Sequence, residues 1–175
     1  PYLIDCHRGP IAVGHNGILE NYLELKSKLE LEGHRFTSET DTEVVAHLVE
    51  CFLKGGADLP TAVIGALRRI RGAFAICVLS GPDPGRIIVA KRGAGAVVVG
   101  LGDNETFIAS DIPAVLPYTR QVVILEDEAD LPVAKRGEAS VVEGVRVGVV
   151  EPDAAGAWRL EPAQDAQQRA LAAAG

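Results

Sequence analysis

The sequence predicts an α+β domain with antiparallel strands. Three segments within the first 71 residues carry apolar side chains at helical spacing, and short β-rich runs separated by tight turns follow them. Short turns join antiparallel strands, whereas parallel strands need long crossover connections. We therefore expect the helices to come first and an antiparallel sheet structure after them, in one domain of ordinary size.

The first helix should follow a short apolar strand at residues 11–13. Asn16 and Gly17 take positive φ angles readily, so residues 14–17 are predicted to form a tight turn after that strand. Beyond the turn the apolar residues change to helical spacing, and a glycine ends the pattern. The residues of this pattern are Ile18, Tyr22, Leu25, Leu29 and the terminal Gly33.

Two more helices are expected before residue 72. Thr40 and Glu43 have the spacing of a capping box, which predicts a helix start there and an end at residues 55–56. The third helix should run from about Pro60 to Arg71, with proline tolerated in its first turn. The inward faces are predicted to carry Val45, Leu48, Val49 and Phe52 in the second helix, and Val63, Leu67 and Ile70 in the third.

Six strands are predicted after the third helix, at 73–79, 86–90, 97–100, 106–109, 121–125 and 145–150. The first of these runs is apolar almost throughout, so we expect it to be covered on both faces. One helical turn is predicted at 111–116. We assign residues 1–150 to the domain and interpret residues 151–175, rich in alanine and glutamine, as a linker or frayed tail.

The bulk composition favours small-molecule chemistry. A formal net charge of −7 gives no field that would attract nucleic acid or an anionic membrane surface. No apolar run approaches the ~20 residues of a membrane span, so the cytoplasm is the expected compartment. We expect no cofactor, because the glycines are not in the order of a phosphate-binding fingerprint. These glycines are Gly93, Gly95, Gly100 and Gly102.

Cysteine and histidine spacing predicts neither a disulfide framework nor a metal site. The cysteines are Cys6, Cys51 and Cys77, of which the last two are expected to fill the core. The histidines His7, His15, His34 and His47 show no ligand spacing, and His47 is predicted to be structural or on the surface.

Three residues are candidates for chemistry, each with a plain structural alternative. Asn16 and Gly17 could form a turn, or could donate hydrogen bonds to an oxyanion from the Asn16 amide and the Gly17 backbone N–H. Asp41 could simply favour a helix start, or could bind the ammonium group of an amino acid. The residues alone leave both alternatives open.

Two motifs together resemble the paired signature of the glucosamine-6-phosphate synthases, a branch of the class II glutamine amidotransferases. The motifs are GHNGILEN at 14–21 and SETDTEV at 38–44, and further matches lie at 71–74, 98–102 and 107–111. The resemblance covers residues 1–126. It implies an N-terminal-nucleophile hydrolase fold, with two stacked antiparallel sheets flanked by helices, incomplete at its N-terminus.

The resemblance also implies an activity. In the family a terminal cysteine, with its α-amino group as base, attacks the side-chain amide of glutamine and releases ammonia. Asn16 and Gly17 would form the oxyanion hole, and Gly17 and Asp41 would bind the substrate, with Asp41 on its α-ammonium group. Ammonia would pass to a separate isomerase domain that converts fructose 6-phosphate to glucosamine 6-phosphate, in a homodimeric parent enzyme.

Several features depart from the family pattern. No cysteine stands at the start of the chain, and Cys6 has no α-amine beside it, so we expect the 175 residues by themselves to be inactive. Gly14 replaces a bulky apolar residue, and residues 94–96 replace a serine-proline pair. The alternatives are a non-catalytic domain of the same fold, or a glutaminase half that serves another ammonia acceptor.

Overall fold

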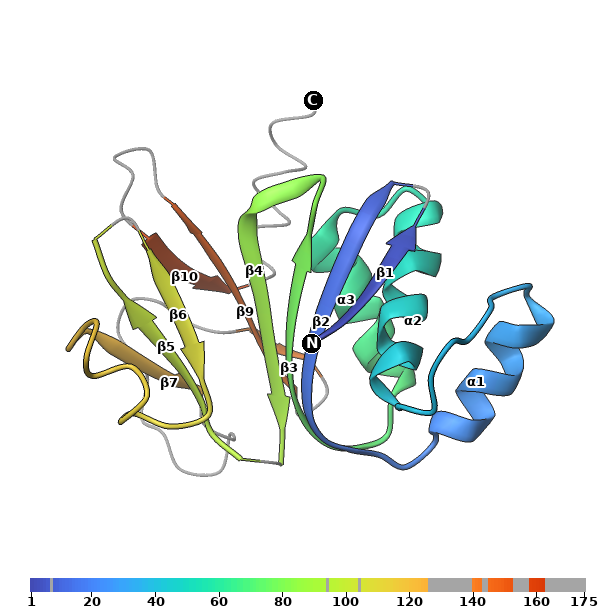
Figure 1. The fold of residues 1–175 in the computed structure, drawn as a ribbon, viewed down its shortest axis with the longest axis horizontal. Helices are drawn as coiled ribbons and strands as arrows, with labels where there is room; N and C mark the ends of the chain where they lie inside the picture. Colours follow the sequence, from blue (N-terminus) through green and yellow to red (C-terminus); the bar gives the residue numbers. More distant parts are fainter. Residues whose placement is uncertain are drawn as a thin grey trace.

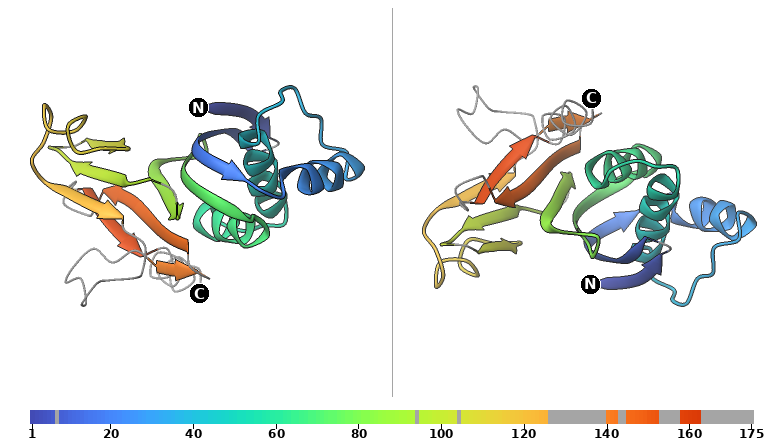
Figure 2. Two further views of the ribbon diagram at one scale, coloured as in Figure 1. Left: turned by 90° about the horizontal axis from the view of Figure 1, so that it is seen from below. Right: turned by 90° about the horizontal axis from the view of Figure 1, so that it is seen from above.

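The computed structural model describes residues 1–6, 8–93, 95–103, 105–125, 140–142, 145–152 and 158–162. In these residues two antiparallel sheets combine with three helices, which confirms the predicted α+β class. The helices lie on one side of the larger sheet and the smaller sheet lies on the other (Figures 1 and 2). No helix in the described part of the chain is long and apolar enough to cross a membrane.

The larger sheet has the strand order β1-β2-β3-β4-β9-β10, with β8 also paired to β9, and the smaller sheet has the order β6-β5-β7. The helices are α1 (Tyr22–Leu31), α2 (Thr42–Lys54) and α3 (Leu59–Arg69). The strands of the larger sheet are β1 (Tyr2–Cys6), β2 (Gly9–Leu19), β3 (Gly72–Ser80), β4 (Asp83–Arg92), β8 (Ser140–Val142), β9 (Val145–Pro152) and β10 (Trp158–Pro162). Those of the smaller sheet are β5 (Val97–Leu101), β6 (Thr106–Ala109) and β7 (Val122–Leu125).

Strand β2 corrects the predicted turn at residues 14–17. The strand continues through this segment to Leu19, because it pairs with β3 along the whole stretch, from Ile11 opposite Ser80 to Leu19 opposite Gly72. Glycine is still required at position 17, where φ is +127° and a Cβ atom would lie 2.3 Å from the carbonyl oxygen of Ala73. Cross-strand hydrogen bonds thus override the turn preference of the Asn-Gly pair.

Helix α2 begins without the predicted capping box. The carboxylate of Glu43 accepts hydrogen bonds from the backbone N–H groups of Thr37 and Ser38 at 2.7 and 2.8 Å, and from the Ser38 hydroxyl at 2.6 Å. Burial alone would raise the pKa of Glu43, but these hydrogen bonds lower it to about 2. Glu43 therefore fastens the loop before α2 to the helix, and Asp41 occupies the N-cap position.

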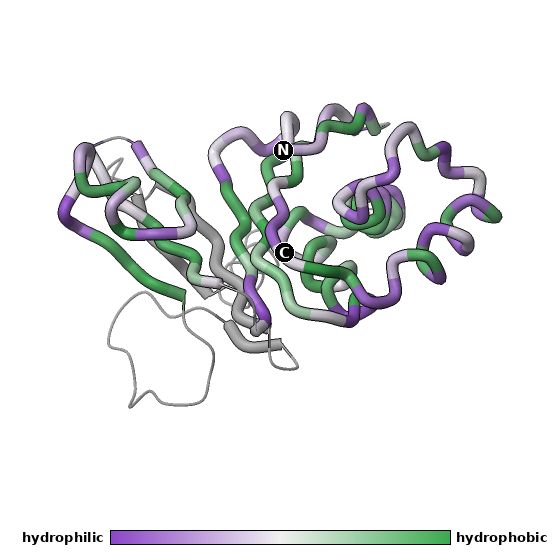
Figure 3. Tube along the Cα trace, turned by 60° about the horizontal axis from the view of Figure 1, so that its bottom comes forward, coloured by the Kyte–Doolittle hydropathy of each residue, from purple (hydrophilic) through white to green (hydrophobic). Residues whose placement is uncertain are grey.

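The main core lies between the helices and one face of β2 and β3. Phe74, Ile76 and Val78 of β3 are buried there against α2 and α3. On the opposite face, Ala75 and Cys77 pack against the smaller sheet. The prediction of a strand covered on both faces thus holds for the middle of β3, while Ala73 and Leu79 near its ends are exposed. Figure 3 shows apolar stretches both in the helices and in the strands of the two sheets.

Several element predictions differ from the structure. Ile18, expected on the apolar face of the first helix, lies in β2 with its side chain 71% exposed. Residues 111–118 form no regular helix, but the backbone N–H of Leu116 donates to the carbonyl oxygen of Ile112 at 3.1 Å, which is the hydrogen bond of the single helical turn predicted there. The predicted tail also contains strand residues. β9 continues to Pro152, and β10 forms a strand because it pairs with the edge of β9. Residues 153–157 and 163–175 lie outside the described residues, as does His7, and the domain boundary at 150 stays a prediction.

Candidate active site

Asp41 joins the two sequence signatures. Its Oδ2 accepts a hydrogen bond from the backbone N–H of Leu19 at 3.1 Å, and its Oδ1 lies 3.2 Å from Nδ1 of His15. The same His15 nitrogen lies 3.2 Å from the hydroxyl of Thr42. Since Asp41 and Thr42 open α2, the helix start is fixed against the C-terminal half of β2.

His15 is a neutral partner for Asp41. Burial lowers the pKa of His15, although the neighbouring Asp41 acts in the opposite direction. The contact with the carboxylate places the ring proton on Nδ1, which leaves Nε2 as an acceptor. That atom is buried and has no hydrogen-bond partner among the described residues. A neutral ring orients the Asp41 carboxylate without cancelling its charge.

The edge of β2 beside Asp41 is open among the described strands. β1 pairs with β2 only as far as Val13, and beyond that residue no described strand covers this edge. Asp41 contacts this edge at the backbone N–H of Leu19, two residues beyond Gly17. Gly17 itself has a φ of +127°, which is outside the range of a regular strand. Asp41 therefore contacts β2 two residues from Gly17.

Asn16 lines a pocket on the face of β2 that is turned toward the smaller sheet. It is paired with Ala75 of β3, whose side chain packs toward the smaller sheet. A pocket of about 200 Å³ opens between the sheets at this point. Its lining consists of Gly14, His15, Asn16, Ala75, Ile76, Cys77, Ala96, Val97, Ile108, Ala109 and Ser110.

The structure thus brings the predicted residues to one stretch of β2 but not into one pocket. Gly17 and Asp41 do not line the pocket that Asn16 lines. The joint use of all three in one cleft stays a prediction.

Two further residues belong to this region and were not predicted to do so. His15 was considered only as part of a turn, and nothing in the sequence spacing links it to Asp41. Cys77 was expected in the core. It lines the pocket beside Asn16, and burial raises the pKa of its thiol to about 11. The pairing of the two strands, with Gly14 opposite Cys77, accounts for this position.

A protein family and a solved structure are similar to this chain. Residues 2–117 match the family described as "Glutamine amidotransferase domain". The solved structure of the B. subtilis glutamine phosphoribosylpyrophosphate amidotransferase, complexed with ADP and GMP, superposes with a TM-score of 0.65 at 26% sequence identity. The match covers 93% of this chain and 31% of that one.

Two curated relatives show which branch of the family this chain is most similar to among those compared. A protein of Methanothermobacter thermautotrophicus is 53% identical over 123 residues, which are 70% of this chain and 20% of the relative. A protein of Thermus thermophilus is 49% identical over 159 residues, or 89% of this chain and 25% of the relative. Both are named glutamine–fructose-6-phosphate aminotransferase [isomerizing]. The chain therefore spans about a quarter of their length or less.

This chain belongs to the glutamine amidotransferase domain family, and its fold is that of the N-terminal-nucleophile amidotransferases. Within that family it matches the glutamine amidotransferase domain of the glutamine–fructose-6-phosphate aminotransferases. The resemblance inferred from the two signatures is thereby confirmed.

Proposed function

We propose that this domain hydrolyses glutamine within a larger enzyme that transfers the ammonia to fructose 6-phosphate. The observation that carries the proposal is the contact between the two signatures, in which Asp41 is held by His15 and by the backbone of Leu19, on either side of the Asn16-Gly17 pair. The names of the curated relatives support the acceptor. Because the chain spans only part of those relatives, we assign sugar chemistry to other parts of the enzyme.

Asp41 would bind the α-ammonium group of glutamine. Its carboxylate is held by a backbone N–H group and a neutral histidine, so its negative charge is oriented but not neutralised by these two partners. The carboxylate is also partly exposed, at 23%, which leaves it accessible to a ligand. A fixed and accessible carboxylate is suited to a charge-assisted hydrogen bond with an ammonium group.

Asn16 and Gly17 would stabilise the oxyanion that forms when the amide carbonyl is attacked. The Asn16 side-chain amide and the Gly17 backbone N–H are donors without charge, and both belong to a strand that is rigidly paired with β3. Donors fixed in this way act mainly on the transition state, and removal of one costs about 2.7–4 kcal/mol in other enzymes.

The nucleophile would come from outside these 175 residues. Cys77 is the described thiol beside Asn16, and with a pKa of about 11 it stays protonated near neutral pH. The Sγ atom of Cys6 donates a hydrogen bond to the carbonyl oxygen of Gly9 at 2.9 Å. Burial raises the pKa of Cys51 as well. We therefore propose that the chain alone does not release glutamate from glutamine.

The remaining assignments rest on composition and on the family. A net charge of −7 gives no field that attracts nucleic acid or an anionic membrane surface, so neither is proposed as a partner. The cytoplasmic location and the homodimeric parent enzyme are proposed from the family resemblance.

The test joins Pro1 to an upstream segment that begins with cysteine and measures glutamate release. Asn16→Ala should lower kcat far more than it raises KM, since an oxyanion donor acts in the transition state. Asp41→Asn should mainly raise KM, because the ammonium contact exists in the ground state as well. Asp58→Asn, at the N-cap of α3, is the matched control and should leave both constants unchanged.

Cys77→Ser tests whether the buried Cys77 thiol is the nucleophile. Because the nucleophile is proposed to be the cysteine of the upstream segment, this variant should retain activity. Equal effects of Asn16→Ala and Asp41→Asn on both constants would contradict the assigned roles. Glutamate release by the 175-residue chain, abolished by Cys77→Ser, would identify a different nucleophile.

A further inference from the structure

A second cluster of polar side chains is buried where the loop after α1 meets α2. It consists of His34 from the loop and of His47 and Glu50 from α2, and it shares no residue with the candidate active site. The side chains are 8%, 9% and 10% exposed. His47 and Glu50 lie one helical turn apart and therefore on the same face of α2.

Three donor atoms of this cluster form a compact triangle. Nδ1 of His34 lies 3.1 Å from Nδ1 of His47 and 3.3 Å from Oε2 of Glu50. The third side, from Nδ1 of His47 to Oε2 of Glu50, is 3.4 Å. Zinc binds histidine nitrogen and carboxylate oxygen at about 2.0–2.2 Å, so the ligand atoms around a tetrahedral ion lie ~3.3–3.5 Å apart. The triangle has nearly these dimensions.

Hydrogen bonding alone does not satisfy all three contacts. If one Nδ1 carries a proton, that proton can serve the other Nδ1 and Glu50, but the remaining nitrogen and the carboxylate then face each other with lone pairs. If both Nδ1 atoms are protonated, both can donate to Oε2 of Glu50, but the two nitrogens then lie 3.1 Å apart with no hydrogen bond between them. A cation in the centre turns all three lone pairs toward one charge and removes the repulsion.

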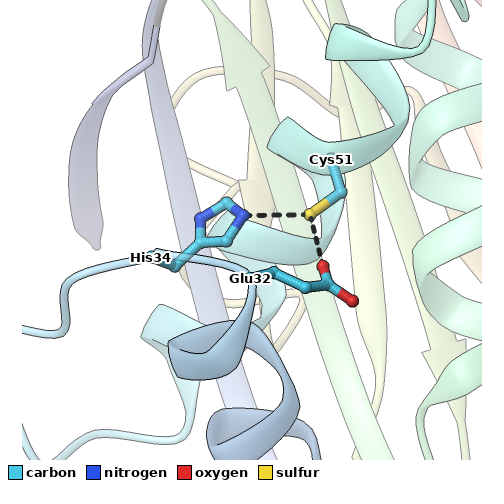
Figure 4. Close-up of side chains that lie close together, drawn as sticks. All are labelled: Glu32, His34 and Cys51. Carbon is cyan, nitrogen blue, oxygen red and sulfur yellow. Dashed lines mark hydrogen bonds between the residues drawn. The ribbon is translucent and has the colours of Figure 1, made fainter.

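The surrounding groups are those that orient metal ligands. Lys54 binds the other oxygen of Glu50, with Nζ 2.9 Å from Oε1, so that Oε2 faces the histidines. Nε2 of His34 lies 3.2 Å from Sγ of Cys51, and Figure 4 shows these two side chains facing each other. Nε2 of His47 is buried without a hydrogen-bond partner among the described residues, and the nearest carboxylate is that of Glu43 at 3.6 Å. Metal-binding histidines commonly donate their second N–H to a carboxylate, a backbone carbonyl or water, and the Glu43 carboxylate lies on that side of His47.

We propose that His34, His47 and Glu50 bind one Zn²⁺ ion, with water as the fourth ligand. Two neutral imidazoles and one carboxylate are a ligand set that zinc accepts. The ion would connect the loop that carries Ser38 and Asp41 to the middle of α2, and it would stabilise the position of the loop. The sequence did not predict this site, because His34 and His47 are separated by the loop and a helix turn and have no motif spacing.

A neighbouring group offers a competing set. Glu32, His34 and Cys51 also lie close together, and Figure 4 shows the three side chains converging on the sulfur. In that set the Cys51 Sγ to Glu32 Oε2 distance is 3.9 Å and Glu32 is exposed. The triangle around Nδ1 of His34 is both tighter and more buried, so we place the ion there.

The experiment titrates the metal-free 175-residue chain with Zn²⁺ against a chromogenic chelator and repeats the titration with Co²⁺. We expect one equivalent of Zn²⁺ and intense visible bands of tetrahedral Co²⁺ without a thiolate charge-transfer band. His34→Gln, His47→Gln and Glu50→Gln should each weaken Zn²⁺ binding by more than the ~10–100-fold that the loss of an outer partner costs. His15→Gln, a buried histidine outside the cluster, is the matched control and should bind as the parent does.

Folding of each variant is checked by circular dichroism, but the parent titration decides the proposal even if a variant fails to fold. No Zn²⁺ binding by the folded parent, or equal binding by parent and His47→Gln, would overturn it. A thiolate band that Cys51→Ser removes would place the ion at Glu32, His34 and Cys51 and would equally overturn the assignment. Neither outcome affects the proposed glutaminase activity.

Discussion

Replacing Gly17 by alanine tests whether the conformation of β2 at the signature is set by glycine. In the structure φ at Gly17 is +127°, and an added Cβ would lie 2.3 Å from the carbonyl oxygen of Ala73 and 2.8 Å from the Cα of Phe74. Both neighbours are backbone atoms of the central strand β3, which cannot move aside as a flexible side chain can. The alanine variant must therefore shift the pairing of β2 and β3 or tolerate strain.

The expected loss of stability follows from these two contributions. A residue held in a disfavoured backbone conformation costs on the order of 1–3 kcal/mol, and overpacking costs a further ~1–3 kcal/mol. Their sum, about 2–6 kcal/mol, is a large part of the ~5–15 kcal/mol that stabilises a typical domain. A loss of about 4 kcal/mol, the middle of this range, divided by a urea m-value of roughly 2 kcal/mol/M, lowers the midpoint of unfolding by about 2 M.

The assay is urea unfolding of the parent and of two comparison variants. Gly72→Ala should behave like Gly17→Ala, because φ is +123° and the new Cβ would lie 2.2 Å from the carbonyl oxygen of Ile18. Gly14→Ala on the same strand is the matched control, since its Cβ would meet the Cys77 side chain at an ordinary 3.8 Å. If Gly17→Ala and Gly14→Ala unfold at the same urea concentration, the reasoning about position 17 is refuted.

Two further predictions concern buried ionisable groups. Glu43→Gln should reduce the free energy of unfolding by about 1.5–3 kcal/mol, the contribution of hydrogen bonds to a charged group. Glu24→Gln alters only exposed ion pairs with Lys28 and Arg71, which water screens, so the free energy of unfolding should stay close to that of the parent. Similar midpoints for the two variants in urea would contradict the role of Glu43. The folded-state pKa of Cys77 is raised by burial from 9.0 to about 11, so the folded protein keeps a proton that the unfolded chain releases, and stability should fall as the pH rises from about 9 to about 11. The measurement is the free energy of unfolding of the parent and of Cys77→Ala between about pH 9 and pH 11. If it falls equally with pH in both proteins, Cys77 does not contribute to the pH dependence.

The spacing of apolar residues could predict those elements that bury one face in the hydrophobic core. Val45, Leu48 and Val49 on α2 have helical spacing and are buried as expected. The local signals failed where contacts between distant segments decide the structure. Asn16 and Gly17 favour a turn by themselves, but β3 pairs with them and extends the strand.

The same limit applies to side-chain partners. Glu43 has the spacing of a capping box with Thr40, yet its carboxylate binds the backbone of residues 37 and 38, because the loop folds over the first turn of α2. Asp41 could be assigned a role from the family resemblance, whereas its contact with His15 depends on how α2 docks on β2. No spacing rule in the sequence describes that docking.

The edge of β2 beyond Val13, which no strand of the described residues covers, has a consequence for the behaviour of the chain in solution. An edge strand that presents unpaired backbone groups is a template on which another extended chain can add. Here the exposed Ile18 side chain lies along that same stretch and adds apolar surface. Self-association through this strand should therefore be controlled by working at low protein concentration, and an added strand would compete with a small ligand for the backbone beside Asp41.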